Sequence, residues 1–182
     1  FMGTAGQAGF PRVNQLQYWI DQGLLAGAPD LELDGQGVAT NIERLPRWNV
    51  PGDGGAGAHS AGDVEQRVRA YLEVNCQHCL NDKGAASNTG YYLDVFRDVD
   101  AGYGICKKPT ATGGGSCGRQ HVVVPGSSDD SIVSCRMEAE NDPQRMMPPI
   151  ARSVAHDGAT ALMRQWINTV VDGDYDNADG CN

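Results

Sequence analysis

The sequence predicts a mainly α-helical fold with long glycine-rich loops and an extended N-terminal segment. Two stretches have apolar side chains at helical spacing, one beginning at Asp63 and one running from residue 158 to 171. The loops follow from composition, because 24 glycines and nine prolines leave only 40% of the 182 residues hydrophobic. We expect an N-terminal helix and connector at residues 1–62, a domain at 63–172 and an acidic tail at 173–182.

Length and charge limit the functions that the chain can have. A chain of 182 residues is long enough to bury a core of its own. Its 14 Lys and Arg residues are outnumbered by 23 Asp and Glu residues, and the formal net charge is -9. Sequence-independent nucleic-acid binding needs basic side chains against phosphates, so we expect no nucleic-acid partner. No apolar run approaches the roughly 20 residues that cross a bilayer, so we expect no transmembrane segment.

The N-terminus and the cysteines bear on where the protein works. Residues 1–10 lack both a basic stretch and an apolar core, so no signal peptide is visible and the sequence is either a mature form or a fragment of a longer precursor. Four of the six cysteines lie singly among glycine and polar residues, where a free thiol is prone to oxidation. We expect these four to be disulfide candidates and the protein to be periplasmic or extracellular. They are Cys106, Cys117, Cys135 and Cys181.

The N-terminal part contains one predicted helix followed by a connector. Apolar side chains of residues 13–22 fall on one helical stripe, and Gly23 is a suitable end signal. Residues 26–62 have little periodicity and many Gly and Pro residues, so we expect a long connector there. Leu45 and Trp48 are the side chains best able to anchor it.

The second predicted helix leads directly to a pair of cysteines. Asp63 can cap its N-terminus, with Gln66 as the capping-box partner three residues later. The helix then delivers Cys76 and Cys79 at its C-terminal end. Its buried face is expected to consist of Val64, Val68, Tyr71 and Leu72.

The middle of the chain has only short predicted elements. Residues 81–119 are dominated by turn signals. Short extended runs are expected at 91–96 and 121–126, where β-branched and aromatic residues cluster. A short helix is expected at 130–138, with Asp130 as its cap.

The end of the predicted domain combines a proline loop with the clearest helix signal in the chain. Residues 145–150 are expected to form a loop, because Pro148 and Pro149 exclude a continuing helix. The stretch 158–171 has a wide apolar stripe typical of an amphipathic helix. The acidic tail after it is better explained as a solvated segment held by Cys181 than as a set of calcium ligands.

Cys76 and Cys79 form a C-x-x-C pair with His78 between them and Leu80 after them. Such a pair can hold a haem, a zinc ion or a redox disulfide, but a covalent haem site needs histidine at the position of Leu80. A thioredoxin-like centre needs its first cysteine at the start of a helix that follows a strand, and this pair follows a helix. A structural zinc site would need a second close pair, whereas the next two cysteines are separated by ten residues of a glycine-rich loop.

Four motifs, in this order, resemble the C-terminal class I cytochrome c-like domain of a family of secreted bacterial c-type cytochromes. They read VRAYLEVNCQHCLND, GICKKPTATGGGSCG, VVVPGSSDDSIVSCRME and RMMPPIARSVAHDGATALMRQWI. The resemblance covers about residues 64–171. Four ordered motifs are far more specific than C-x-x-C alone.

The resemblance implies a covalently bound haem c and assigns roles to particular residues. Cys76 and Cys79 match the two cysteines that form thioethers to haem. Met147, in preference to Met146, matches the distal axial ligand, and the closing helix would cross the helix that ends at Cys76. Leu80 matches the proximal histidine and cannot coordinate iron.

Leu80 leaves three possibilities for the cofactor. In the first, haem is retained and its iron takes a nitrogen ligand from His78, His121 or His156. In the second, haem is absent, Cys76 and Cys79 form disulfides, and the domain is a disulfide-stapled shell. The volume of the haem would then be filled by Leu80, Tyr91, Tyr92 and Phe96. In the third, copper is bound by soft donors, which would require reduced thiols in an oxidising compartment. The copper donors would be Cys76, His78, Cys79 and Met147.

The function expected from these observations is that of an exported domain of an electron-transfer family. It would act with a protein redox partner or as a subunit of a larger membrane-associated redox complex, and Arg136 and Arg152 would face haem propionates. The alternatives are a haem-free structural or interaction subunit and a copper-binding protein. Whether the chain is an enzyme stays open, although no Ser-His-Asp arrangement or phosphate loop is present and an electron-transfer or structural role is favoured.

Overall fold

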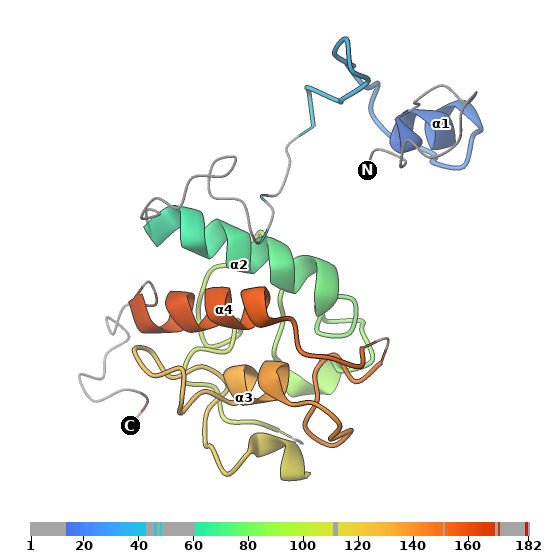
Figure 1. Cartoon of the computed structure of the whole chain (residues 1–182). Coiled ribbons are helices and arrows are strands. Elements are labelled where there is room, and N and C mark those ends of the chain that lie inside the picture. Colours follow the sequence, from blue (N-terminus) through green and yellow to red (C-terminus); the bar gives the residue numbers. More distant parts are fainter. Residues whose placement is uncertain are drawn as a thin grey trace. The chain divides into compact units, whose positions relative to one another are not determined.

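Figure 1 shows the computed structural model, which describes residues 14–42, 46, 48, 61–110, 113–150, 152–169, 171 and 181. The chain divides into two compact units, Phe1–Arg44 and Leu45–Asn182. Three sequence predictions fall outside the described residues: the helix start at Val13, the anchor at Leu45, and the acidic tail apart from Cys181.

The described residues contain four α-helices and two short 3-10 helices. These are α1 (Gln15–Asp21), α2 (Ala61–Asn75), η2 (Ser87–Thr89), η3 (Gly113–Ser116), α3 (Ile132–Glu138) and α4 (Asp157–Thr169). In the same residues, β structure consists of isolated bridges. They join Leu33 to Ala39, Ile105 to Val123 and His121 to Ser131.

The prediction of a mainly α, class I cytochrome c-like fold is wrong. Only about a third of the described residues are helical, and little of the remainder is strand. The stretch between α2 and α3 forms turns, short 3-10 segments and isolated bridges, because its glycines and prolines favour turns over longer regular elements. The motifs that carried the resemblance lie largely in loops, and loop motifs do not determine how much of a chain is helical.

Several predicted element boundaries are also corrected. The extended runs expected at 91–96 and 121–126 are not strands, although His121 and Val123 form isolated bridges. Helix α2 begins at Ala61, so that Asp63 lies in its first turn instead of capping it. The N-cap of α3 is Ser131 and not the predicted Asp130, and the Ser131 side chain makes no capping hydrogen bond.

In the first unit, Asn14 determines where α1 begins. Its side-chain oxygen accepts a hydrogen bond from the Leu16 N–H at 3.0 Å, which satisfies a donor that the first turn leaves unpaired. Its amide nitrogen donates to the Gly37 carbonyl at 3.1 Å and joins the helix to the following turn. Gly23 lies just after the helix with φ +69°, a conformation that favours glycine and ends the helix as predicted.

In the second unit, α4 lies between α2 and α3 and packs against both (Figure 1). The core consists of one face of each long helix together with apolar side chains from the loops. Helix α2 contributes Val64, Val68 and Leu72; helix α4 contributes Ala159, Leu162, Met163, Trp166 and Ile167; and the loops contribute Leu93, Tyr103, Ile105, Val122 and Val123. The periodicity in the sequence therefore identifies the buried faces of both long helices.

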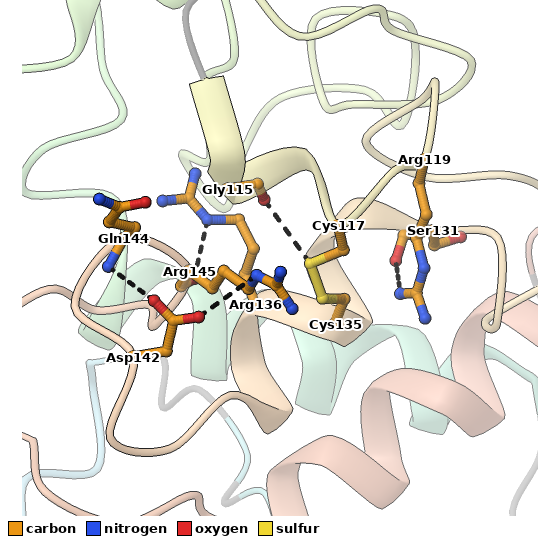
Figure 2. Close-up of a disulfide and its surroundings, with 9 residues drawn as sticks. All are labelled: Gly115, Cys117, Arg119, Ser131, Cys135, Arg136, Asp142, Gln144 and Arg145. Atoms are coloured by element: carbon orange, nitrogen blue, oxygen red, sulfur yellow. Dashed lines mark hydrogen bonds and ion pairs between the residues drawn. A yellow bond between two sulfur atoms is a disulfide. The ribbon is translucent and has the colours of Figure 1, made fainter.

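Two disulfides and one arginine tie the loops to this helical core. Cys106 is bonded to Cys181. Cys117 is bonded to Cys135 of α3, as Figure 2 shows. Arg164 of α4 connects three segments, because it forms hydrogen bonds with Asp129 at 2.7 Å, with Ser128 at 3.1 Å and with Glu138 of α3. The unit is thus held by cross-links where its backbone has little regular structure.

Candidate functional site

A cavity of about 490 Å³ lies beside the C-terminal end of α2. Its volume is within the roughly 300–1,000 Å³ typical of ligand pockets, and most of its lining is apolar. Its walls come from the end of α2 with the turn that follows, the loop around residues 85–93, residues 107–110, α3, the loop at 147–149, and residues 152–160. Segments far apart in the sequence therefore meet around one space.

The first wall carries the C-x-x-C pair, and both thiols are free. The turn after α2 is held by backbone hydrogen bonds, from the Cys76 N–H to the Leu72 carbonyl at 2.9 Å and from the Cys79 N–H to the Cys76 carbonyl at 3.2 Å. Burial, with a smaller contribution from Cys79, raises the pKa of Cys76 to about 12. The Cys76 thiol is therefore protonated at neutral pH, which disfavours the thiolate chemistry of a disulfide oxidoreductase.

Leu80 lines the same wall and packs against the hydrophobic core. Its N–H donates to the Cys76 carbonyl at 3.1 Å, and its own carbonyl accepts from the Leu93 N–H at 3.0 Å, so the backbone here is fixed. Tyr91 also lines the cavity and packs against the core, and burial raises its pKa well above the ordinary value. Phe96, which was also expected to fill the interior, is 90% exposed, so that expectation is wrong. It lies in a turn that directs it to solvent.

Another part of the lining is formed by the loop that contains Met147. The Met147 N–H donates to the Arg136 carbonyl at 2.9 Å, and the Met147 carbonyl accepts from Arg152. Arg152 also donates to the carbonyls of Ala139 and, at 3.0 Å, Val154. Its guanidinium therefore holds the backbone of the methionine loop, a role that the sequence did not indicate.

Of the three candidate histidines, His78 and His156 line the cavity and His121 does not. The His156 ring stacks on Tyr71 with the ring centroids 5.7 Å apart, and Trp48 meets it edge-on at 4.4 Å. His121 lies in a bridge with Ser131, and burial, followed by the nearby Lys108, lowers its pKa.

The cavity is also bordered by four cationic side chains, Lys107, Lys108, Arg136 and Arg152, while the described residues of its lining include no Asp or Glu. Arg136 is half-buried, and this burial lowers the pKa of its guanidinium. The sequence analysis did not single out Lys107 and Lys108, although the two lysines stand together in the second of the four motifs.

The cysteines and histidines do not form a metal-chelating cluster. Among the described residues, no group of three or more His, Cys, Asp or Glu side chains is placed to hold a metal ion. The copper donor set of Cys76, His78, Cys79 and Met147 therefore has no preformed cluster to support it. The same part of the chain contains no helix long and apolar enough to cross a membrane.

Fold and site together define a disulfide-bonded protein with an apolar, cation-bordered cavity next to a free C-x-x-C pair. Comparisons with protein-family models, with curated proteins and with solved structures found no match to this chain.

Proposed function

We propose that this chain binds haem c in the cavity and serves as an exported electron-transfer domain. One observation carries the proposal: apart from His121, the residues that the sequence singled out as candidate cofactor ligands all line one cavity. They are Cys76, His78, Cys79, Met147 and His156. These residues come from three separate segments: the turn at 76–79, the loop at Met147, and His156.

The residues present fit a haem group in all but one respect. Cys76 and Cys79 are both free and would hold the group through thioether bonds, and Met147, which lines the same cavity, would offer a sulfur ligand. The unfilled role is the nitrogen ligand, because Leu80 has none to give; His78 and His156 are the two side chains of the lining that could supply it. Haem, when bound, supplies a reversible one-electron iron couple.

The setting and the partner follow from disulfides and charge. Two disulfides support a site of action in the periplasm or outside the cell, where such bonds persist. A formal net charge of -9 would steer the domain toward a basic redox partner or a basic face of a larger redox complex.

A second candidate function is a haem-free structural or interaction subunit. Leu80 favours it, because this side chain packs against the core at the position where a haem-binding chain would need histidine. The two disulfides would then provide the stability, and the cavity would not hold a haem.

The test is expression in a bacterial periplasm together with the haem-attachment machinery. We compare the wild-type chain with Leu80→His, which restores C-x-x-C-H, and with Cys76→Ala/Cys79→Ala, which removes the attachment points. We expect the wild-type protein to carry haem that remains attached when the protein is denatured, seen as an added haem mass and a reduced α band. The double variant should carry no haem.

Two results would reject haem binding by the natural chain. Haem in Leu80→His but not in the wild type would mean that the cavity fits the group and that Leu80 has abolished its attachment. A colourless wild type and a colourless Leu80→His, both with intact disulfides, would leave the structural subunit as the remaining function.

A further inference from the structure

The cations of this chain are unevenly paired. The structure describes all of the 14 Lys and Arg residues except Arg12, Arg44 and Arg47. Five of the described ones have a carboxylate within ion-pair distance. These five are Arg67, Arg69, Arg97, Arg145 and Arg164. The described cations without such a partner are Lys83, Lys107, Lys108, Arg119, Arg136 and Arg152, and four of them line the cavity.

This arrangement runs against the overall charge. In a chain with a formal net charge of -9, most cations should find a carboxylate nearby, yet the cavity lining gathers cations and, among the residues that the structure describes, includes no Asp or Glu. Partly buried cations are stabilised by an anionic partner, through charge-assisted hydrogen bonds. The missing partner is expected to come from the ligand.

Arg152 is not the side chain that meets this anion, because its guanidinium already donates to three backbone carbonyls. Arg136 is different. Among the described residues, only the Nε of its guanidinium donates a hydrogen bond, to the Arg145 carbonyl at 3.0 Å. Figure 2 shows that the nearby Asp142 is directed to Arg145, so that carboxylate does not neutralise Arg136.

The glycines around Arg136 and Lys107 give these side chains room. A Cβ added at Gly115 would come 3.3 Å from the Arg136 Cζ, and a Cβ added at Gly90 would come 3.4 Å from the Lys107 Nζ. The Lys107 backbone is fixed as well, because its carbonyl accepts from the Val122 N–H at 2.8 Å. The fold therefore fixes the backbone of Lys107 and, through its Nε, the guanidinium of Arg136 at the cavity.

We propose that Lys107 and Arg136 form an acid-recognition pair, so that the cavity selects an apolar ligand that carries carboxylate groups. The inference rests on the proposed function for the identity of that ligand, in which the propionates of haem would be the acid groups. Lys108, which is exposed at the border of the same cavity, adds to the positive charge that an approaching acid meets.

The experiment uses a ligand without metal, so that neither thioether formation nor iron ligation can contribute. Protoporphyrin IX and its dimethyl ester are titrated separately against the full chain, and binding is followed by the quenching of tryptophan fluorescence. The two ligands share one apolar ring and differ only in their acid groups. We expect the free acid to bind about tenfold or more tightly than the ester, as charge-assisted hydrogen bonds would give.

Variants assign that preference to the pair. Lys107→Gln and Arg136→Gln should each reduce the preference for the acid by about fivefold to tenfold while leaving the affinity for the ester unchanged. The matched controls are Lys83→Gln and Arg119→Gln, which remove cations that also lack a carboxylate partner but do not line the cavity. They should keep the full preference. An unchanged affinity for the ester shows that a variant is folded.

Three results would overturn the inference: equal binding of acid and ester, binding of neither, or a preference that survives in both pair variants. The outcome is independent of the haem-attachment test. A preference for the acid in a chain that attaches no haem would leave the acid-recognition pair intact and reject the electron-transfer function. Attached haem together with equal binding of acid and ester would reject the acid-recognition pair and leave the electron-transfer function intact.

Discussion

The cysteines of this protein fall into two groups with opposite properties. Cys106 and Cys117 are bonded to partners 75 and 18 residues away in the sequence, whereas Cys76 and Cys79 lie within a single turn and remain free thiols. The bonded cysteines connect loops that have few regular elements. The free cysteines lie in a turn that backbone hydrogen bonds already hold, at the wall of a cavity.

The size of the closed loop explains why the two groups differ. Chain-entropy arguments give about 4.5 kcal/mol for a loop of 75 residues and about 3 kcal/mol for one of 18. A bond between Cys76 and Cys79 would close a loop so short that the same argument gives roughly 2 kcal/mol, before any cost of distorting the turn. The gain in stability is thus a sufficient reason for the bonded cysteines to form disulfides and a weak reason for Cys76 and Cys79 to do so. The C-x-x-C pair is better explained by the cavity that it lines.

The largest expected effect is the loss of the long-range disulfide. Cys106→Ala/Cys181→Ala should lower the free energy of unfolding by about 4.5 kcal/mol, because the unfolded chain gains the conformational freedom that the bond removed. Chemical denaturation of the purified protein measures this. The matched control is Cys76→Ala/Cys79→Ala, which in the ligand-free protein removes two sulfurs but no bond and should cost about 1 kcal/mol. Equal losses in the two double variants would break the comparison between the two groups.

Removal of the second disulfide should have a smaller effect. Cys117→Ala/Cys135→Ala opens the shorter loop and should lower the free energy of unfolding by about 3 kcal/mol. Because Cys135 lies in α3 next to Arg136, this variant also tests whether the disulfide supports the cavity. A weaker preference for carboxylate ligands is expected in addition to the loss of stability. A loss below that of the Cys76→Ala/Cys79→Ala control would contradict the loop-length argument.

The third prediction concerns the Met147 loop, which lines the same cavity as the free cysteines. Arg152→Met removes the donors that hold the carbonyls of Met147, Ala139 and Val154. We expect a loss of about 2 kcal/mol in the free energy of unfolding, since two part-buried acceptors, the carbonyls of Met147 and Ala139, lose their partners, and a weaker affinity for any ligand of the cavity.

Arg145→Met is the control for that variant. Its ion pair with Asp142 is largely exposed, so the variant should lose less than about 1 kcal/mol and keep the ligand affinity. If Arg152→Met were no worse than Arg145→Met, the methionine loop would not depend on Arg152.

The sequence predicted the parts of the cavity that have local signals. Apolar periodicity located α2 and α4, and two consecutive prolines predicted the loop that carries Met147. The C-x-x-C spacing pointed to Cys76 and Cys79. Each of these signals depends on neighbours in the chain, and each is therefore visible without the fold.

The remaining features depend on which segments meet in space. The sequence named four disulfide candidates but left their pairing open. The sequence predicted that Arg152 faces a ligand, although the N–H groups of Arg152 donate hydrogen bonds to backbone carbonyls of the neighbouring segments. Lys107 gave no signal, because a lysine in a glycine-rich loop resembles any exposed lysine until the cavity beside it is known. The helix content was overestimated for a related reason, since loops have no periodicity from which their path can be derived.

The smallest expected effect is a pH dependence to which the free cysteines contribute and the bonded cysteines do not. Burial, then Cys79, raises the pKa of Cys76 from 9.0 to about 12. Above pH 9 the unfolded chain releases the Cys76 proton while the folded chain retains it, so the free energy of unfolding declines as the pH rises from about 9 to about 12.

Between pH 8 and pH 10 the ligand-free wild type should lose about 1.4 kcal/mol more than Cys76→Ala, because one pKa unit corresponds to about that energy. Denaturation curves of both proteins at the two pH values measure the difference, and comparison with the variant cancels the titration of other groups. Rapid alkylation of Cys76 at pH 8 in the folded protein, or parallel pH profiles for the two proteins, would show that this thiol is not withdrawn from water and would remove the contrast with the bonded cysteines.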